Sequence, residues 1–196
     1  MSDSTSPATD GFTAGVLVGS IRRDSVSRKV ATAMAGLVPA GLTLRPLRID
    51  DLPLYDEDLD DGPPPAPWAR FRAEVRAVDA ILFVTPEYNR SVPAPLKNAV
   101  DVGSAPHGRN VFAGRPAGIV SLSPGRMGAF GANHHLRQSL VFLDMPTMQQ
   151  PEAYLGGSDE MLGTDGTLRS DAVRELLTGF LTAFDVWVAG HVAVPA

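Results

Sequence analysis

The sequence predicts an α/β fold in which helices cover both faces of a parallel sheet of five strands. Two observations carry this prediction. Five short apolar runs alternate with amphipathic helical patterns, which is typical of a doubly wound sandwich. Three of the runs are apolar at nearly every position, which indicates strands that are buried on both faces. The expected strands are 13–19, 42–49, 80–85, 116–123 and 145–150.

Helical patterns occupy the intervals between these strands. The first follows Asp24 or Ser25 as N-cap and ends before Pro39. Others are expected at about 66–78 and 131–143, from Pro95 onward, and after Ser170 as a cap. This arrangement fits a flavodoxin-like three-layer α/β/α sandwich with the five-stranded parallel sheet in the order 2-1-3-4-5. Ligands of such sheets bind beyond the carboxyl ends of the strands, so the loops after strands 1, 3 and 4 are the candidate site.

The composition is that of a water-soluble globular chain. It has 196 residues, of which 44% are hydrophobic, and 17 basic against 22 acidic residues give a net charge of −5. This charge gives no reason to expect binding to nucleic acid or to an anionic membrane. No apolar run approaches the roughly 20 residues that span a bilayer. We expect residues 1–12 to be a disordered tail and residues 13–196 to form a single domain.

The chain contains no cysteine, which excludes disulfides, thiolate metal sites and cysteine nucleophiles. Any redox chemistry therefore requires a bound cofactor. The N-terminus lacks the basic and apolar regions of a secretory signal, so we expect a cytoplasmic protein. His134 and His135 are adjacent and point to different faces of a helix, which makes them a poor metal pair, and no metal site is expected.

The loop after the first strand, GSIRRDSVSRK at 19–29, combines hydroxyl groups with a basic residue at the start of a helix. Free backbone N–H groups and the helix dipole at such a position favour an anion. Ser20, Ser25, Ser27 and Arg22 therefore suggest a phosphate site, although a capped helix with surface serines would have the same pattern. The segment has neither the GxxxxGK[ST] nor the GxGxxG spacing of the usual nucleotide loops.

The loop after the fourth strand, SLSPGRMGAFG at 121–131, is rich in glycine. Gly125, Gly128 and Gly131 would let the backbone approach a flat ligand, and the Ser123 hydroxyl could hydrogen-bond to it. A flexible glycine-rich turn is the alternative interpretation. Ser121 stands where a GxSxG nucleophile elbow needs its first glycine, so an esterase-like hydrolase is not favoured.

The loop after the third strand lies in TPEYNRSVPAPLKNAVD at 85–101. Pro86 and Pro93 stiffen it, and its fixed backbone groups would suit the donor and acceptor edge of a heterocycle. Tyr88 offers an aromatic face and Asn89 an amide that both donates and accepts. Lys97, Asn98 and Asp101 follow on the next helix and are expected to hold this loop or to contact a partner chain.

This last segment resembles the signature of the NAD(P)H-dependent FMN reductase family, of the quinone and chromate reductase type, whose pattern is close to PEYN-x-x-x-P-x-x-LKNA-x-D. Gly19, Ser20, Arg22 and Ser25 match an early G-S-x-R-x-x-S pattern. HLRQSLVFLD at 135–144 matches a third segment of that subgroup. The resemblance covers nearly the whole chain after residue 12, with all three matches in order.

The resemblance implies one non-covalent FMN, with NAD(P)H as co-substrate. Hydride would pass through FMN to a quinone, or to chromate, azo compounds or free flavin, by a ping-pong mechanism. No catalytic residue is expected, because the cofactor carries the chemistry. The implied FMN-binding residues are Ser20, Arg22, Ser25, Val26 and Ser27 at the phosphate, Pro86, Glu87, Tyr88 and Asn89 along the isoalloxazine edge, and Ser123 and Gly125 on the other side.

The resemblance also implies a homodimer or homotetramer, with the helices around LKNAVD and HLRQ as candidate contacts. The sequence departs from the family at Ser27, where asparagine is frequent, and at Ala129, where a second glycine is frequent. Glu87 is expected to be structural, or to contact the flavin through its backbone, rather than to act as a general base. Trp68 and Trp187 are expected to serve packing or an interface rather than to stack on the flavin.

One alternative function stays open at this point. A flavodoxin-like electron carrier without its own NAD(P)H turnover would share the fold, although such carriers tend to be strongly acidic.

The stretches 50–67 and 156–167 are acidic or proline-rich excursions. The first could be a wall of the site, a partner contact or a solvated loop.

Overall fold

The fold is a single parallel sheet of five strands in the order β2-β1-β3-β4-β5, as the sequence predicts. The structure is a computed structural model that describes residues 11–192. The tail expected at residues 1–12 therefore lies outside the described residues, except for Gly11 and for Phe12, which opens the first strand. The strands are β1 (Phe12–Val18), β2 (Leu42–Pro46), β3 (Ala80–Thr85), β4 (Ala117–Leu122) and β5 (Ala153–Leu155).

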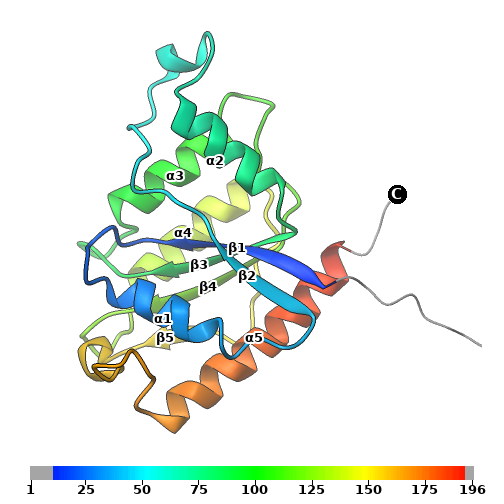
Figure 1. Cartoon of the computed structure of the whole chain (residues 1–196). Coiled ribbons are helices and arrows are strands. Elements are labelled where there is room, and N and C mark those ends of the chain that lie inside the picture. Colours follow the sequence, from blue (N-terminus) through cyan, green and yellow to red (C-terminus); the bar gives the residue numbers. More distant parts are fainter. Residues whose placement is uncertain (1–10, 193–196) are drawn as a thin grey trace, which may run out of the picture.

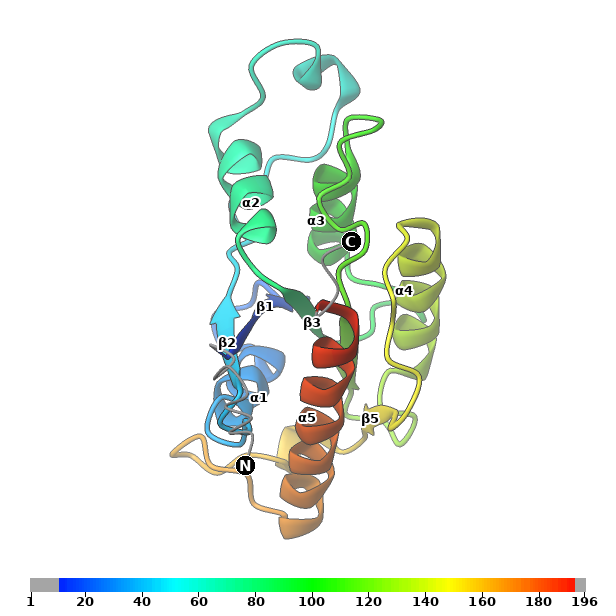
Figure 2. The ribbon, with the colours of Figure 1, turned by 90° about the vertical axis from the view of Figure 1, so that its right-hand side faces the viewer.

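Helices cover both faces of the sheet (Figures 1 and 2). They are α1 (Val26–Met34), α2 (Ala66–Arg76), α3 (Ala94–Ser104), α4 (Phe130–Phe142) and α5 (Asp171–Val192), with short 3₁₀ turns η1 (Glu57–Asp60) and η2 (Ser158–Glu160). Helices α1 and α5 pack on one face, and α2, α3 and α4 on the other. Within residues 11–192, no helix combines the length and the apolar character that a membrane crossing requires.

The central strand β3 shows why its sequence is apolar throughout. Ile81 and Phe83 point into the core beneath α2, α3 and α4. Leu82 and Val84 point into the second core, beneath α1 and α5. Successive side chains of a strand alternate between faces, so a strand covered on both sides needs an apolar residue at every position. All six residues of β3 and all six of β4 are buried.

The prediction of the fifth strand at 145–150 is wrong. That segment pairs with β4 at one position, where Ala117 donates its N–H to the Pro146 carbonyl and accepts from the N–H of Met148. Pro146 and Pro151 have no N–H to donate, which limits the ladder that this segment can form. Regular pairing begins at Ala153, opposite Val120, and gives β5 only three residues.

The helix starts follow the predicted caps. Ser25 is the N-cap of α1, and its Oγ accepts the Arg28 N–H at 3.1 Å. Ser170 does the same for α5 by accepting the Val173 N–H at 3.4 Å. Pro95 stands in the first turn of α3, where a missing N–H costs nothing because that N–H would have no partner within the helix.

The 50–67 excursion is anchored to the fold. The Asn98 amide donates to the carbonyls of Leu52 and Pro53 and accepts the Tyr55 N–H. Asn98 therefore holds this excursion, and the expectation that it ties down the 85–93 loop is wrong. The Trp68 indole N–H donates to the Pro53 carbonyl at 3.0 Å, so Trp68 serves packing as expected.

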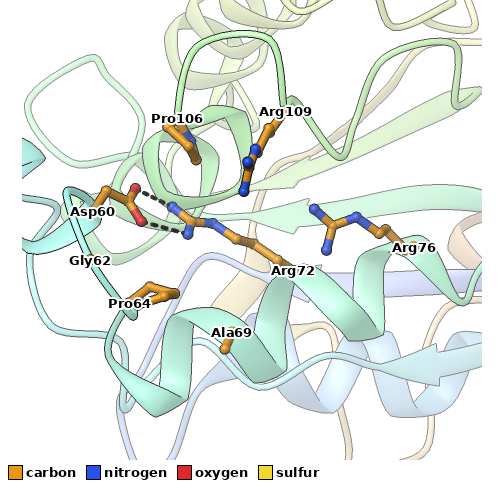
Figure 3. Close-up of a pocket in the computed structure, with 8 residues that line it drawn as sticks. All are labelled: Asp60, Gly62, Pro64, Ala69, Arg72, Arg76, Pro106 and Arg109. Atoms are coloured by element: carbon orange, nitrogen blue, oxygen red, sulfur yellow. Dashed lines mark hydrogen bonds and ion pairs between the residues drawn. The ribbon is translucent and has the colours of Figure 1, made fainter.

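A buried ion pair forms the second anchor of the excursion. The Arg72 guanidinium donates to both carboxylate oxygens of Asp60, at 2.8 and 2.6 Å (Figure 3). The side chains of Arg72 and Asp60 are only 6% and 4% exposed. This contact holds the pKa of the Asp60 carboxyl below its usual range. Asp60 therefore stabilises the fold above the unfolded pKa of about 3.9, and this stabilisation is lost as the pH falls through the folded pKa.

Replacing Asp60 with Asn should destabilise the protein by about 3 kcal/mol at pH 7, because it leaves the Arg72 charge buried without its counter-charge. Urea unfolding at pH 7 measures this loss. The difference in the free energy of unfolding between wild type and D60N should shrink as the pH falls through the lowered folded pKa of Asp60, where protonation breaks the same pair in the wild type. Equal stabilities at pH 7 would show that the pair is not an anchor.

Candidate active site

The loops after β1, β3 and β4 meet at the carboxyl edge of the sheet. Gly19 makes the first of these contacts, with its N–H donating to the Val84 carbonyl at 2.9 Å. A Cβ at this position would lie 2.6 Å from Thr85 Oγ1 and 3.2 Å from Pro86 Cδ. Because only glycine leaves room for this approach, the β1 loop packs directly against the β3 loop.

The β1 loop presents the start of α1 to a cleft of about 230 Å³. Ser20, Ser25 and Ser27 are buried residues at this cleft, and the exposed Arg22 stands at its rim. Ser25 Oγ already caps the helix. Among residues 11–192, the hydroxyls of Ser20 and Ser27 have no hydrogen-bond partner, so both are free to bind a ligand. Free N–H groups at the helix start add further donors.

The β3–α3 loop turns tightly just after Glu87. Tyr88 and Ser91 exchange two backbone hydrogen bonds, at 3.1 and 2.9 Å. The two residues between them, Asn89 and Arg90, have φ values of 51° and 62°. Such a two-residue turn needs positive φ at both central positions, and asparagine tolerates it better than most residues. Asn89 thus shapes the turn, while the half-exposed Tyr88 lies in the wall of the cleft.

Glu87 connects this loop to α4. Its Oε2 accepts the Ala132 N–H at 3.0 Å, and its Oε1 accepts from Arg90 at 3.2 Å. The N-cap of α4 is Ala129, which has no side-chain acceptor, so Glu87 caps the helix from another loop. Gly131 permits this contact, because a Cβ there would lie 2.8 Å from the same carboxylate oxygen. The Glu87 side chain therefore has a structural role, and the expected contact of its backbone with the flavin stays a prediction.

Hydrogen bonds within the β4–α4 loop and beneath it hold this loop in place. Ser123 Oγ donates to the Gly125 carbonyl and accepts the Ala129 N–H, both at 3.1 Å. Beneath the loop, the buried Ser121 hydroxyl donates to the Gly128 carbonyl at 2.8 Å and accepts from Asn133 at 3.2 Å. These bonds fix the loop, so it is not a flexible glycine-rich turn.

The cleft brings together all but two of the eleven predicted site residues. The exceptions are Asn89 and Gly125, which shape their loops without lining the cleft. Four lining residues were not predicted, namely Leu122, Pro124, Ser158 and Asp159. Ser158 and Asp159 belong to the 156–167 excursion, which the hydrogen bond from the Ser158 N–H to the Ser123 carbonyl (3.1 Å) holds beside the β4 loop.

The histidines of α4 have separate partners. His134 is hydrogen-bonded to the Tyr154 hydroxyl at 2.9 Å, and His135 to the Ser91 hydroxyl at 2.6 Å. Burial, together with Glu152, raises the pKa of Tyr154 to about 12, so its hydroxyl stays protonated and donates to Glu152. Within residues 11–192, no group of three acidic or histidine side chains is placed to hold a metal ion.

Strand order, helix placement and a cleft at the carboxyl edge define a flavodoxin-like protein. The family model for NADPH-dependent FMN reductases matches residues 13–160, and the chain belongs to this family. A quinone reductase of Pseudomonas putida is 54% identical over 93% of this chain and 98% of that protein. A 2-hydroxy-1,4-benzoquinone reductase of Burkholderia is 39% identical over 88% of this chain and 94% of that protein.

The structural comparison agrees with the sequence comparison. FerB, a flavoenzyme NAD(P)H:(acceptor) oxidoreductase of Paracoccus denitrificans, superposes with a TM-score of 0.86 at 36% identity, over 92% of this chain and 98% of that one. The protein is therefore an oxidoreductase that uses FMN and NAD(P)H. The chain's own residues fit FMN, because unpartnered hydroxyls, an arginine and a helix start form one end of the cleft, as a phosphate requires.

Replacing Glu87 with Gln should leave most FMN binding intact, because the amide oxygen still accepts the Ala132 N–H. Replacing it with Ala should remove the cap and lower stability by about 1 kcal/mol. FMN fluorescence titration and urea unfolding measure the two effects. A large loss of FMN affinity in E87Q would show that the charge, rather than the cap, is what matters.

Proposed function

We propose that this protein passes hydride from NAD(P)H through FMN to quinones. The observation that carries the proposal is the convergence of three loops on one cleft that joins a phosphate-type helix start to an open aromatic rim. The names of the relatives support the acceptor class, since two of them are quinone reductases.

In this proposal, Ser20, Arg22, Ser27 and the start of α1 hold the FMN phosphate, with Ser25 and Val26 beside them. The cleft volume of about 230 Å³ is below the range of about 300–1,000 Å³ typical of pockets that enclose a whole ligand. Pro86, Tyr88 and Ser123 would therefore hold the isoalloxazine ring at the open mouth of the cleft, where a second molecule could reach it.

FMN, when bound, supplies the hydride and electron chemistry. The residues of the chain bind and orient it, and backbone N–H groups of the β3 and β4 loops stabilise charge on the ring. Glu87 has no role as a general base in this proposal, because its carboxylate already accepts from Ala132 and Arg90. The open mouth of the cleft would admit NAD(P)H and the acceptor in turn, and such exchange would give ping-pong kinetics.

The purified protein should be yellow and should oxidise NADH or NADPH rapidly with a soluble quinone. Steady-state rates at several concentrations of both substrates should give parallel double-reciprocal lines. A panel of quinone, chromate, azo and free-flavin acceptors, tested with each nucleotide, would identify the preferred pair. Flavin that only a separate reductase reduces would instead show an electron carrier.

Replacing Arg22 with Ala should weaken FMN binding by about 10–100-fold, the effect of losing a hydrogen bond to a charged group worth about 1.5–3 kcal/mol. Riboflavin lacks the phosphate, so its binding should not change. Arg23→Ala is the matched control, because Arg23 is equally exposed but does not line the cleft. Equal losses for FMN and riboflavin would place Arg22 away from the phosphate.

We also propose that the protein is a homodimer or homotetramer. A groove between α3 and α4 is lined by Lys97, Val100, His135 and Phe142, among others. Phe142 is 89% exposed and the adjacent Val141 is 75% exposed, so a second copy would cover apolar surface here. Light scattering should give a mass of at least twice 20.7 kDa, and Phe142→Asp should lower it. A monomeric wild type would contradict the proposal.

The proposed reaction depends on NAD(P)H, which is an intracellular reductant. We therefore infer a cytoplasmic location. Fractionation of cells that express the protein would test this, and recovery in a secreted fraction would contradict it.

A further inference from the structure

A second recess, of about 220 Å³, lies beside the anchored 50–67 excursion (Figure 3). Its walls come from η1 and the residues after it, from α2 and from the loop after α3. It shares no lining residue with the flavin cleft. The lining residues are Asp60, Gly62, Pro64, Ala69, Arg72, Arg76, Pro106 and Arg109.

Arg72 forms the floor of this recess and is already satisfied. The residue is 5% exposed, both of its terminal nitrogens donate to Asp60, and its Nε donates to the Val102 carbonyl at 2.8 Å. One carboxylate therefore neutralises the charge of Arg72, and the three hydrogen bonds restrict the movement of this side chain.

Arg76 and Arg109 have no such match. Both are exposed, and among residues 11–192 neither lies within 4 Å of a carboxylate. Three guanidinium groups and one carboxylate, that of Asp60, line the recess, while Glu57, Asp58 and Asp61 stand on or beside the same turn without lining it.

Like charges that converge on one concave surface repel each other unless an anion joins them. Figure 3 shows the Arg109 side chain directed into the recess and Arg76 at its end, on the same side as Arg72. Guanidinium groups present paired N–H donors that match the oxygens of a phosphate. Pro64 and Pro106 make two of the walls stiff, which limits the ordering that binding would require.

We propose that this recess is a binding site for a small oxyanion of the phosphate class, either inorganic phosphate or the phosphate group of a small monoester. Arg76 and Arg109 bind the anion, and the Arg72–Asp60 pair supports them without taking part. The site is separate from the FMN phosphate site, so it adds a second anion site to the molecule.

The test uses the full chain saturated with FMN, so that the phosphate end of the cleft is filled. Inorganic phosphate is titrated against chloride of equal ionic strength, because screening alone alters stability. Binding is followed by the rise in melting temperature and by ³¹P NMR line width. Phosphate should raise the melting temperature above the chloride control in a saturable manner.

Arg76→Gln and Arg109→Gln should each weaken phosphate binding about tenfold, and the double variant should abolish it. Arg169→Gln is the matched control, because Arg169 is exposed and lies outside both the recess and the cleft. Since Arg76 and Arg109 are exposed and unpaired, FMN absorbance and circular dichroism should stay unchanged in these variants, which separates loss of the site from loss of the fold.

A parallel titration with glycerol phosphate distinguishes the two sources of the anion. Tighter binding of the monoester assigns the site to a phosphorylated metabolite, and tighter binding of inorganic phosphate assigns it to the free ion. A melting temperature that phosphate raises no more than chloride would overturn the proposal. So would binding that persists in the double variant, or that is lost in Arg22→Ala instead.

Discussion

The hydrogen bond between the Glu87 carboxylate and the Ala132 N–H is the contact on which the cleft depends. It joins the loop after β3 to the first turn of α4, and therefore to the loop after β4. The close approach at Gly19 joins the same β3 loop to the phosphate-type loop after β1. Three segments from distant parts of the sequence are thus held as one rigid edge, so a flat ligand meets a surface that is formed before it binds.

Most of the fold could be predicted because its core strands are unambiguous. Strands β3 and β4 are buried on both faces, and such strands show apolar runs that depend on no distant contact. The fifth strand could not be located in the same way. An extended segment joins a sheet only where its N–H groups face a neighbouring strand. The prolines at 146 and 151 lack an N–H, and regular pairing with β4 therefore begins at Ala153.

The residues of the candidate site were also only partly predictable from the sequence. Candidate residues whose chemistry is local, such as the serines and Arg22 at the start of α1, could be proposed from their position after a strand. Asn89 shows the limit of this reasoning, because its pattern fits a ligand contact as well as a turn with positive φ, and only the backbone distinguishes them. Ser158 and Asp159 carry no motif, and a single tertiary hydrogen bond to the Ser123 carbonyl brings them to the cleft.

The 50–67 excursion is anchored independently of the loops that form the cleft. Its anchors, Asn98, Trp68 and Arg72, lie on α2 and α3 rather than on the loops that form the cleft. We therefore expect insertions or deletions at its exposed tip to leave the cleft at the carboxyl edge of the sheet undisturbed, provided that the three anchors persist. The length and surface of the excursion can therefore change without replacing a residue that forms the cleft.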